Sequence, residues 1–181
     1  MDIVYFIIPA YNEEENIEKV ICDWYPIVEK IGNESRLVII DDGSRDKTYE
    51  LMQKAAESRP QFQPLTKDNE GHGATVLFGY YYALECGADY IFQTDSDGQT
   101  NPEEFWTFWE QRRGYDLLIG HRNHREDGFT RIFVTKVLRI VIRLCFRVEV
   151  VDANTHFRLM EAIMLRQQIV LIPENFNLSN V

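Results

Sequence analysis

Short apolar runs alternate with segments of helical periodicity along this chain, and this alternation is the strongest constraint on its fold. The expected strands are residues 3–8, 37–40, 62–65, 89–94 and 117–120. The expected helices between them are residues 13–31, 47–58, 74–86 and 102–112. Strands that alternate with helices form a mainly parallel sheet with helices on its faces. The sequence therefore predicts an α/β domain with a doubly wound, Rossmann-like sheet.

Polar residues mark the helix boundaries. Asn12 precedes Glu13, Glu14 and Glu15, and we expect it to cap the first helix. Asp46 is expected to cap the second helix. Pro26 predicts a kink in the first helix or an early end to it.

The last third of the chain has a different pattern. Residues 129–146 are typical of a long amphipathic helix, and residues 148–151 of an extended segment. Asp152 begins a polar loop, and residues 160–167 predict a final helix.

Composition narrows the class of protein. A chain of 181 residues is enough for one domain with a sizeable core, and its net charge of −10 argues against a nucleic-acid partner. No uncharged apolar run approaches the ~18 residues of a membrane span. Three widely spaced cysteines indicate buried, reduced thiols, and the chain enters a strand directly after Met1-Asp2. These features predict a cytoplasmic protein.

Four of the expected strands are followed by segments that share one edge of the sheet. These segments are Pro9-Ala10-Tyr11-Asn12, Asp41-Asp42-Gly43-Ser44, Asp95-Ser96-Asp97 and Gly120-His121-Arg122. Ligands of open α/β sheets bind outside the carboxyl ends of the strands. Turns alone would explain one or two polar segments, whereas polar residues at several strand ends favour a binding site.

Asp95 and Asp97 stand one residue apart directly after an apolar strand. Two adjacent carboxylates repel each other unless a cation lies between them. Oxygen ligands at this density suit Mg²⁺ or Mn²⁺, and Gln99 offers another oxygen. An ordinary polar turn explains the same residues, and on this motif alone it is the better explanation.

Six motifs in order are similar to one family. They are Ile7-Ile8-Pro9-Ala10-Tyr11-Asn12-Glu13-Glu14, Val38-Ile39-Ile40-Asp41-Asp42-Gly43-Ser44, Asn69-Glu70-Gly71-His72-Gly73-Ala74, Asp95-Ser96-Asp97-Gly98-Gln99, Gly120-His121-Arg122 and Asp152-Ala153-Asn154-Thr155-His156-Phe157-Arg158-Leu159. The chain resembles the inverting family 2 glycosyltransferases, closest to the dolichyl- and polyprenyl-phosphate mannose and glucose synthases. The resemblance implies the GT-A fold, a nucleotide-sugar donor and a divalent metal, Mg²⁺ or Mn²⁺.

The resemblance also implies which residues bind the nucleoside. They are Pro9, Ala10, Tyr11, Glu13, Asp41, Asp42, Gly71 and Gly73. Asp42 is the expected nucleoside carboxylate, with Asp41 sharing that role. Helix capping is the alternative for both, but Asp46 is better placed to cap. For the two glycines, a plain turn is nearly as good an explanation.

The resemblance assigns the remaining residues to the metal, the diphosphate and the acceptor. Asp95 and Asp97 would hold the metal–diphosphate unit, with Gln99 as a further ligand. Arg122 would add a second cation, unless it forms a surface ion pair. Asp152 and Arg158 lie where the family places acceptor-side residues. A structural pair between Arg158 and Glu161 is an equal alternative.

The acceptor decides the chemistry. A hydroxyl acceptor needs a base, for which Asp152 is the candidate, whereas a lipid phosphate is already anionic and needs only positive charge. Five basic residues interleave with apolar ones near the expected amphipathic helix: Arg131, Lys136, Arg139, Arg143 and Arg147. This pattern fits a helix on anionic lipid, and equally a core-facing helix with a solvated cationic face.

The sequence thus predicts inverting, metal-dependent transfer of a hexose from a GDP-mannose or UDP-glucose type donor to a polyprenyl or dolichyl phosphate. The protein could then lie on the inner face of the cell membrane. A saccharide hydroxyl acceptor is one alternative, and a nucleotide-sugar-binding domain that is inactive alone is another. We expect one domain over 1–181, with the nucleotide part at about 1–98 and an acceptor part at about 99–181 that is truncated at its C-terminus.

Overall fold

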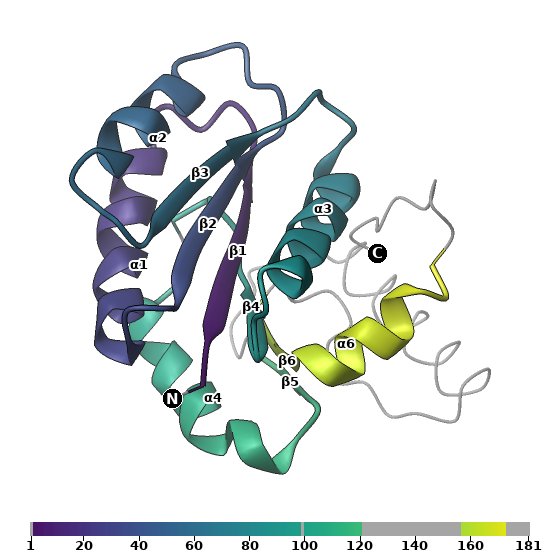
Figure 1. Cartoon of the computed structure of the whole chain (residues 1–181). Coiled ribbons are helices and arrows are strands. Elements are labelled where there is room, and N and C mark those ends of the chain that lie inside the picture. Colours follow the sequence, from purple (N-terminus) through teal and green to yellow (C-terminus); the bar gives the residue numbers. More distant parts are fainter. Residues whose placement is uncertain (1, 99, 121–156, 173–181) are drawn as a thin grey trace, which may run out of the picture.

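Six strands form one mixed sheet in the order β3-β2-β1-β4-β6-β5 in the computed structural model, which describes residues 2–98, 100–120 and 157–172 (Figure 1). The strands are β1 (Val4–Ala10), β2 (Arg36–Asp41), β3 (Phe62–Thr66), β4 (Tyr90–Gln93), β5 (Leu117–Ile119) and β6 (Arg158–Glu161). β1 pairs in parallel with β2 and β4, and β2 in parallel with β3. β6 runs antiparallel to β4 and β5. The predicted, mainly parallel sheet is confirmed.

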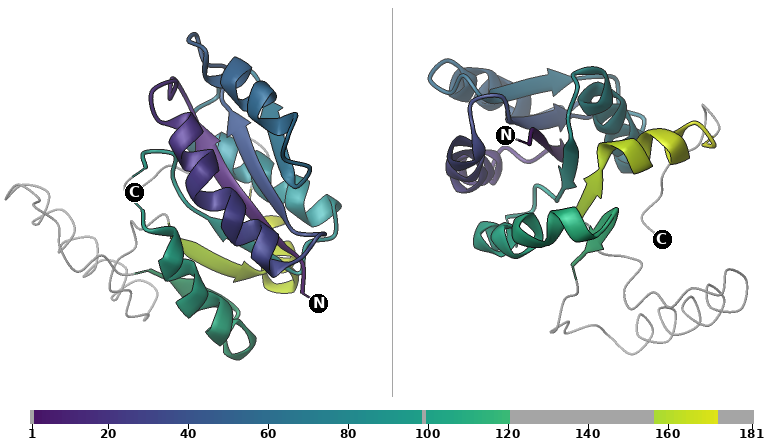
Figure 2. Two further views of the ribbon diagram at one scale, coloured as in Figure 1. Left: turned by 90° about the vertical axis from the view of Figure 1, so that its left-hand side faces the viewer. Right: turned by 60° about the horizontal axis from the view of Figure 1, so that its bottom comes forward.

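Helices cover both faces of the sheet (Figures 1 and 2). Their bounds are α1 (Ile17–Ile31), α2 (Thr48–Ala56), α3 (His72–Glu85), α4 (Phe105–Gln111) and α6 (Ala162–Ile169), with short 3₁₀ turns η1 (Pro102–Glu104) and η2 (Arg112–Gly114) around α4. α1, α2 and α4 share one apolar cluster with the sheet, and α3 and α6 share the other.

β1 shows why the sequences of the central strands are continuously apolar. All seven of its residues are buried. Phe6 and Ile8 belong to the cluster beneath α1 and α2, whereas Tyr5 and Ile7 face α3. A strand covered on both faces needs apolar side chains at every position.

Aromatic rings join the two halves of the sheet on the α1 face. The ring centroid of Phe92 lies 5.2 Å from that of Phe6 and 4.7 Å from that of Phe157, just before β6. Trp24 and Phe105 lie against the same rings. These contacts fix β6 beside β4, and therefore place the start of β6 at the carboxyl edge of the parallel strands.

The first helix begins later than the sequence predicts. α1 starts at Ile17 with Asn16 as its N-cap residue, so the prediction that Asn12 caps it was wrong. Asn12 has a positive φ of 54°, and its side-chain oxygen accepts a hydrogen bond of 2.9 Å from the Arg45 backbone N–H. Pro26 lies inside α1, which continues to Ile31, so an early end there was also wrong.

The sequence predicted that Asp46 caps the second helix, but the N-cap residue of α2 is Lys47, the residue after Asp46. The Asp46 carboxylate accepts a 3.0 Å hydrogen bond from the backbone N–H of Thr48, the first residue of α2. It also accepts one of 3.1 Å from the Glu14 backbone N–H. Asp46 thus joins the start of α2 to the loop after β1.

Two further predictions need correction. Residues 158–161 form strand β6, where the sequence predicted a polar loop running into a helix, and α6 begins only at Ala162. Leu159 and Met160 are buried on opposite faces of the sheet, which is the pattern of a strand. Cys22 and Cys86 are free thiols but exposed, so their predicted burial was wrong. The predicted segments 129–146 and 148–151 lie outside the described residues.

Membrane-spanning helices were searched for in the same residues. Within 2–98, 100–120 and 157–172, no helix is long and apolar enough to cross a bilayer.

Candidate functional site

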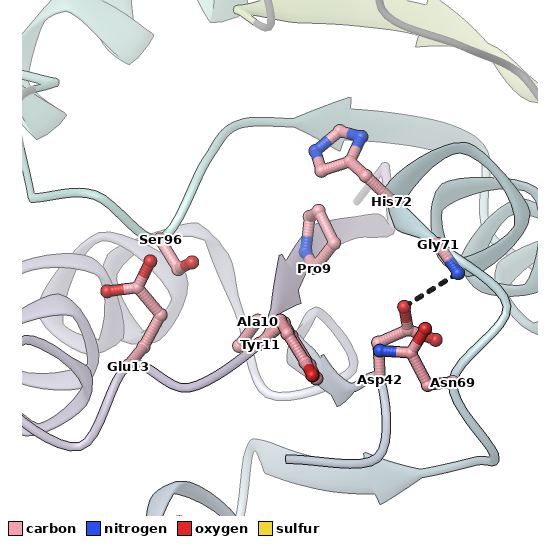
Figure 3. Close-up of a pocket in the computed structure, with 9 residues that line it drawn as sticks. All are labelled: Pro9, Ala10, Tyr11, Glu13, Asp42, Asn69, Gly71, His72 and Ser96. Atoms are coloured by element: carbon pink, nitrogen blue, oxygen red, sulfur yellow. Dashed lines mark hydrogen bonds between the residues drawn. The ribbon is translucent and has the colours of Figure 1, made fainter. Parts of the chain in front are cut away.

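A pocket of about 340 Å³ opens at the carboxyl ends of β1, β2 and the segment after β4 (Figure 3). Its walls come from four separate stretches of chain. The lining residues are Pro9, Ala10, Tyr11, Glu13, Asp42, Asn69, Gly71, His72 and Ser96. All nine belong to four of the six motifs quoted above, so residues far apart in sequence meet where the sheet topology predicts.

The structure brings together six residues that the sequence assigned to nucleoside binding. They are Pro9, Ala10, Tyr11, Glu13, Asp42 and Gly71. Asn69, His72 and Ser96 also line the pocket but had no assigned role, although each lies inside a quoted motif. Among the described residues, Asp41, Gly73, Asp95, Asp97 and Arg158 are not part of the lining.

The end of β1 forms the floor of the pocket, and a network of hydrogen bonds holds the loop that follows. Pro9 and Ala10 are the last residues of β1, and Tyr11 beyond them is 44% exposed. The Glu13 backbone N–H donates to the Thr48 hydroxyl at 2.8 Å, and the Glu13 carboxylate accepts from the Asn16 side chain at 2.8 Å. Glu13 is therefore held in place from both sides.

On the side of the pocket across from β1, Asp42 holds the loop before α3 in place. Its side chain is buried and accepts hydrogen bonds from the backbone N–H groups of Glu70 at 3.1 Å and Gly71 at 2.9 Å (Figure 3). The Lys67 ammonium lies 3.1 Å from the same carboxylate. Burial acts to raise the pKa of Asp42, but hydrogen bonds from Thr75, Glu70 and Lys67 outweigh it and lower the pKa below its usual value.

Lys67 supplies the positive charge that pairs with Asp42 on this side of the pocket. Its side chain is 12% exposed, and its ammonium lies 2.8 Å from the Glu70 carboxylate and donates to the Asp68 carbonyl at 2.6 Å. Burial would lower the pKa of Lys67, yet its bonds to Glu70 and Asp42 raise it. The loop that leads into α3 is thereby anchored to the turn after β2.

Asp41 has a different role from its neighbour. Its carboxylate accepts from the Thr66 hydroxyl at 2.9 Å and from the Ser44 backbone N–H at 3.3 Å. Gly43 follows with a φ of +68°, and a Cβ there would lie 2.9 Å from the Asn69 backbone nitrogen. The turn thus packs directly beneath the loop that carries Asn69, and Asp41 stabilises that turn.

His72 connects the pocket to the segment after β4. It is the first residue of α3, after Gly71 with its φ of 92°. Its Nε2 lies 3.4 Å from the Asp95 Oδ1, and the two side chains are 36% and 19% exposed. Gly73, which the sequence assigned to nucleoside binding, is buried within α3.

The predicted metal residues lie at this junction. Asp95 contacts His72 and Ser96 lines the pocket, so the Asp95–Asp97 segment borders it. Within residues 2–98, 100–120 and 157–172, no three His, Cys, Asp or Glu side chains gather as a ready metal site. Gln99, Arg122 and Asp152 lie outside the described residues. The visible donors are two carboxylates, a ligand type suited to Mg²⁺ and Mn²⁺.

Arg158 begins β6 and pairs in register with Gln93 on one side and Ile119 on the other. It therefore lies at the carboxyl edge of β4, near the pocket's border. Glu161 lies at the opposite end of β6, beside Tyr90. The strand separates the two residues, which disfavours the alternative of an Arg158–Glu161 pair.

The sequence matches the family model described as Glycosyl transferase family 2 over residues 5–170. A protein of Pectobacterium atrosepticum named undecaprenyl-phosphate 4-deoxy-4-formamido-L-arabinose transferase is 31% identical over 140 residues, which are 76% of this chain and 42% of that protein. A protein of the same name from Pseudomonas fluorescens is 29% identical over 143 residues, covering 77% of this chain and 41% of its own. The chain spans less than half the length of these curated relatives.

Solved structures show the same fold. Mannosyl-3-phosphoglycerate synthase from Rubrobacter xylanophilus superposes with a TM-score of 0.69 at 14% identity, covering 90% of this chain and 55% of its own. Glucosyl-3-phosphoglycerate synthase from Mycobacterium tuberculosis, crystallised with Mn²⁺, UDP and glucosyl-3-phosphoglycerate, gives a TM-score of 0.65 at 19% identity, covering 91% and 58%. The expected GT-A fold is confirmed.

Proposed function

Because the chain belongs to glycosyl transferase family 2, we propose that it is a glycosyltransferase that binds a nucleotide-diphospho-sugar in the pocket at the ends of β1 and β2. One observation carries this proposal. Every residue that lines the pocket comes from a motif of this family, and the four motifs meet only in the folded chain. Parallel strand topology alone brings these ends together, but it does not explain why each of them carries a motif of the same family.

The pocket residues suggest how a nucleoside would lie. The base and ribose would contact Pro9, Ala10 and Tyr11, with Glu13 near the ribose or base. Tyr11 is exposed enough to pack its ring against a base. Asp42 would form the facing wall, because its bonds to Glu70 and Gly71 set the position of the loop.

Phosphates would lie toward Asp95 and Asp97. These carboxylates, with Gln99, would hold Mg²⁺ or Mn²⁺, and the bound metal would neutralise the nucleoside diphosphate as it leaves. His72 contacts Asp95 and lines the pocket, so it would lie between the nucleoside and the phosphates. Arg122 would add a second positive charge to the diphosphate.

We propose a polyprenyl phosphate as the acceptor, since both curated relatives carry undecaprenyl-phosphate in their names. Such a phosphate is already anionic, and it can attack the anomeric carbon in a single in-line displacement that inverts the sugar. Arg158 at the edge of β4 would supply positive charge for it. A saccharide hydroxyl would instead need Asp152 as a base.

A thermal-shift panel tests the donor. GDP- and UDP-linked mannose and glucose would each be added with Mn²⁺ or Mg²⁺ to the full chain. A ligand at ~100-fold its dissociation constant stabilises the native state by about 2.7 kcal/mol, which is easily measured. Stabilisation by one nucleotide-sugar confirms the donor site. If none of the panel stabilises the chain, the proposal is wrong.

A transfer assay then tests the acceptor. The stabilising donor, labelled in its sugar, would be incubated with undecaprenyl phosphate or with a soluble saccharide. Label recovered in the lipid fraction supports the proposed acceptor, and label recovered in the saccharide favours the alternative.

A further inference from the structure

A small polar cluster lies where α3 crosses the end of β4, with two buried members and one half-buried member, Arg158. It consists of Tyr80 from α3, Gln93 from the end of β4 and Arg158 from the start of β6. Tyr80 is 5% exposed and Gln93 2%. Their surroundings are apolar, because β4, β6 and α6 contribute Ile91, Met160 and Leu165 to this side of the core.

The three side chains form a hydrogen-bonded chain with a fixed direction. The Tyr80 hydroxyl donates to the Gln93 side-chain oxygen. Arg158 has only donors, so its hydrogen bond with Tyr80 must end on the hydroxyl oxygen. The order is therefore Arg158 to Tyr80 to Gln93. Burial raises the pKa of Tyr80, although Arg158 acts against this, so the hydroxyl keeps the proton that it donates.

The sheet register sets this chain next to the pocket. Gln93 pairs with Arg158, and both lie at the carboxyl edge of the parallel strands. Asp95 and Ser96 follow Gln93 within three residues, and Ser96 lines the pocket. The polar cluster thus stands directly behind the segment that borders the proposed diphosphate site.

Stability alone does not explain a half-buried arginine beside two buried polar side chains. Polar groups lose hydration when they are buried, and well-packed apolar residues of similar volume are often equally stable or more so. Hydrogen bonds among such side chains do, however, fix the orientation of the groups that make them. The bond to Tyr80 constrains the plane of the Arg158 guanidinium.

We propose that Tyr80 and Gln93 are positioning residues that orient the Arg158 guanidinium to bind the phosphate of the acceptor. A planar guanidinium binds phosphate through two parallel hydrogen bonds, and this needs a defined orientation. The inference rests on the proposed function, and it names the residues that make one part of that site selective for an anionic acceptor.

The test uses the full chain and farnesyl phosphate as a soluble polyprenyl phosphate. Tyr80→Phe removes the hydroxyl and keeps the ring. Its dissociation constant for farnesyl phosphate, measured by titration calorimetry, should rise roughly tenfold, because a hydrogen bond to a charged group is lost. The dissociation constant for the stabilising nucleotide-sugar should stay within twofold, because Tyr80 is not in the pocket lining. Tyr82→Phe on the same helix is the matched control, and both constants should stay at their wild-type values.

A double-mutant cycle separates positioning from general damage. Arg158→Ala should also weaken farnesyl phosphate binding, and adding Tyr80→Phe to it should cause no further loss. Gln93→Met gives a second single variant, which should show the same selective effect. The inference is overturned if folded Tyr80→Phe and Gln93→Met bind farnesyl phosphate as well as the wild type, or if the losses in the double variant add. A wild-type chain that no nucleotide-sugar stabilises would instead refute the proposed function.

Discussion

Asp41 and Asp42 are neighbours in sequence but serve different parts of the site. Asp42 faces the pocket and holds the loop with Glu70 and Gly71, whereas Asp41 bonds to Thr66 and Ser44 within the turn. The sequence predicted a shared nucleoside role. Which of two adjacent carboxylates faces a ligand depends on where the strand ends, and that boundary is set by tertiary contacts.

Asp42→Asn should destabilise the fold by about 1–3 kcal/mol, because a buried charged acceptor of several hydrogen bonds is lost. The folded pKa of Asp42 lies below its unfolded value of 3.8. Its contribution is therefore complete above that value and is lost as the pH falls through the folded pKa. Urea denaturation at several pH values should show wild-type stability falling faster below 3.8 than that of the variant.

The matched control is Asp68→Asn, an exposed carboxylate in the same loop. It should leave stability within about 0.5 kcal/mol of the wild type. Equal effects of the two substitutions would mean that the contacts of Asp42 contribute no more than those of a surface residue.

Asp97→Asn tests the metal assignment. The nucleotide-sugar should still stabilise the variant in the absence of metal, but the additional stabilisation by Mn²⁺ or Mg²⁺ should disappear. Glu50→Gln on α2, whose side chain is exposed, should keep both parts of the thermal shift. A full metal-dependent shift in Asp97→Asn would remove that residue from the metal site.

Among the elements, α3 packs unusually close to the sheet. An added Cβ at Gly79 would lie 2.7 Å from Ile40 Cδ1 and in conflict with Ile7 Cγ2. Gly79→Ala should therefore destabilise the fold by about 1–3 kcal/mol, in spite of the better helix propensity of alanine. Thermal denaturation measures this. Gly114→Ala, where no atom lies within 4 Å of an added Cβ, should change little, and equal destabilisation by both would contradict the packing argument.

Some elements were predictable because their signal is local. β1, β2 and β4 place apolar residues on both faces, which is the pattern of strands in a covered parallel sheet. The four residues of β6 carry too short a pattern, and only their pairing with β4 and β5 makes them a strand. The acidic residues before α1 resemble a first helical turn. Instead, Glu13 and Glu14 bond to Thr48, Asp46 and Lys47 across the turn.

At the scale of the molecule, the binding edge was predictable from topology and the details of the pocket were not. Parallel strands place their carboxyl ends together, so Pro9, Asp42 and Ser96 had to converge. The selection of Asn69 and His72 for the lining depends on how the loop before α3 folds over Asp42. The conformation of the loop before α3 depends on these tertiary contacts, so no local sequence pattern predicts it.

Membrane association is a property of the whole chain. Flotation of the protein with vesicles of neutral lipid, or of neutral lipid with added anionic lipid, tests the basic segment 129–146. We expect co-flotation with the anionic vesicles, weakened by salt because the attraction is electrostatic. Replacing Arg139 and Arg143 with Gln should reduce it, whereas replacing Lys54 on α2 should not. Absence of the protein from both floating fractions would refute a peripheral location.

A backbone hydrogen bond between the end of β5 and the start of β6 has a consequence for how related proteins can diverge. The Gly120 backbone N–H donates to the Phe157 carbonyl at 2.8 Å, and a Cβ on Gly120 would lie 3.1 Å from Phe157 Cβ. Gly120 and Phe157 are therefore held together at the rim of the sheet. A connection between two ends that are fixed in this way can change in length or sequence at little thermodynamic cost, with every strand left in register. Under the function proposed above, such changes between Gly120 and Phe157 would alter the acceptor preference and leave the donor pocket as it is.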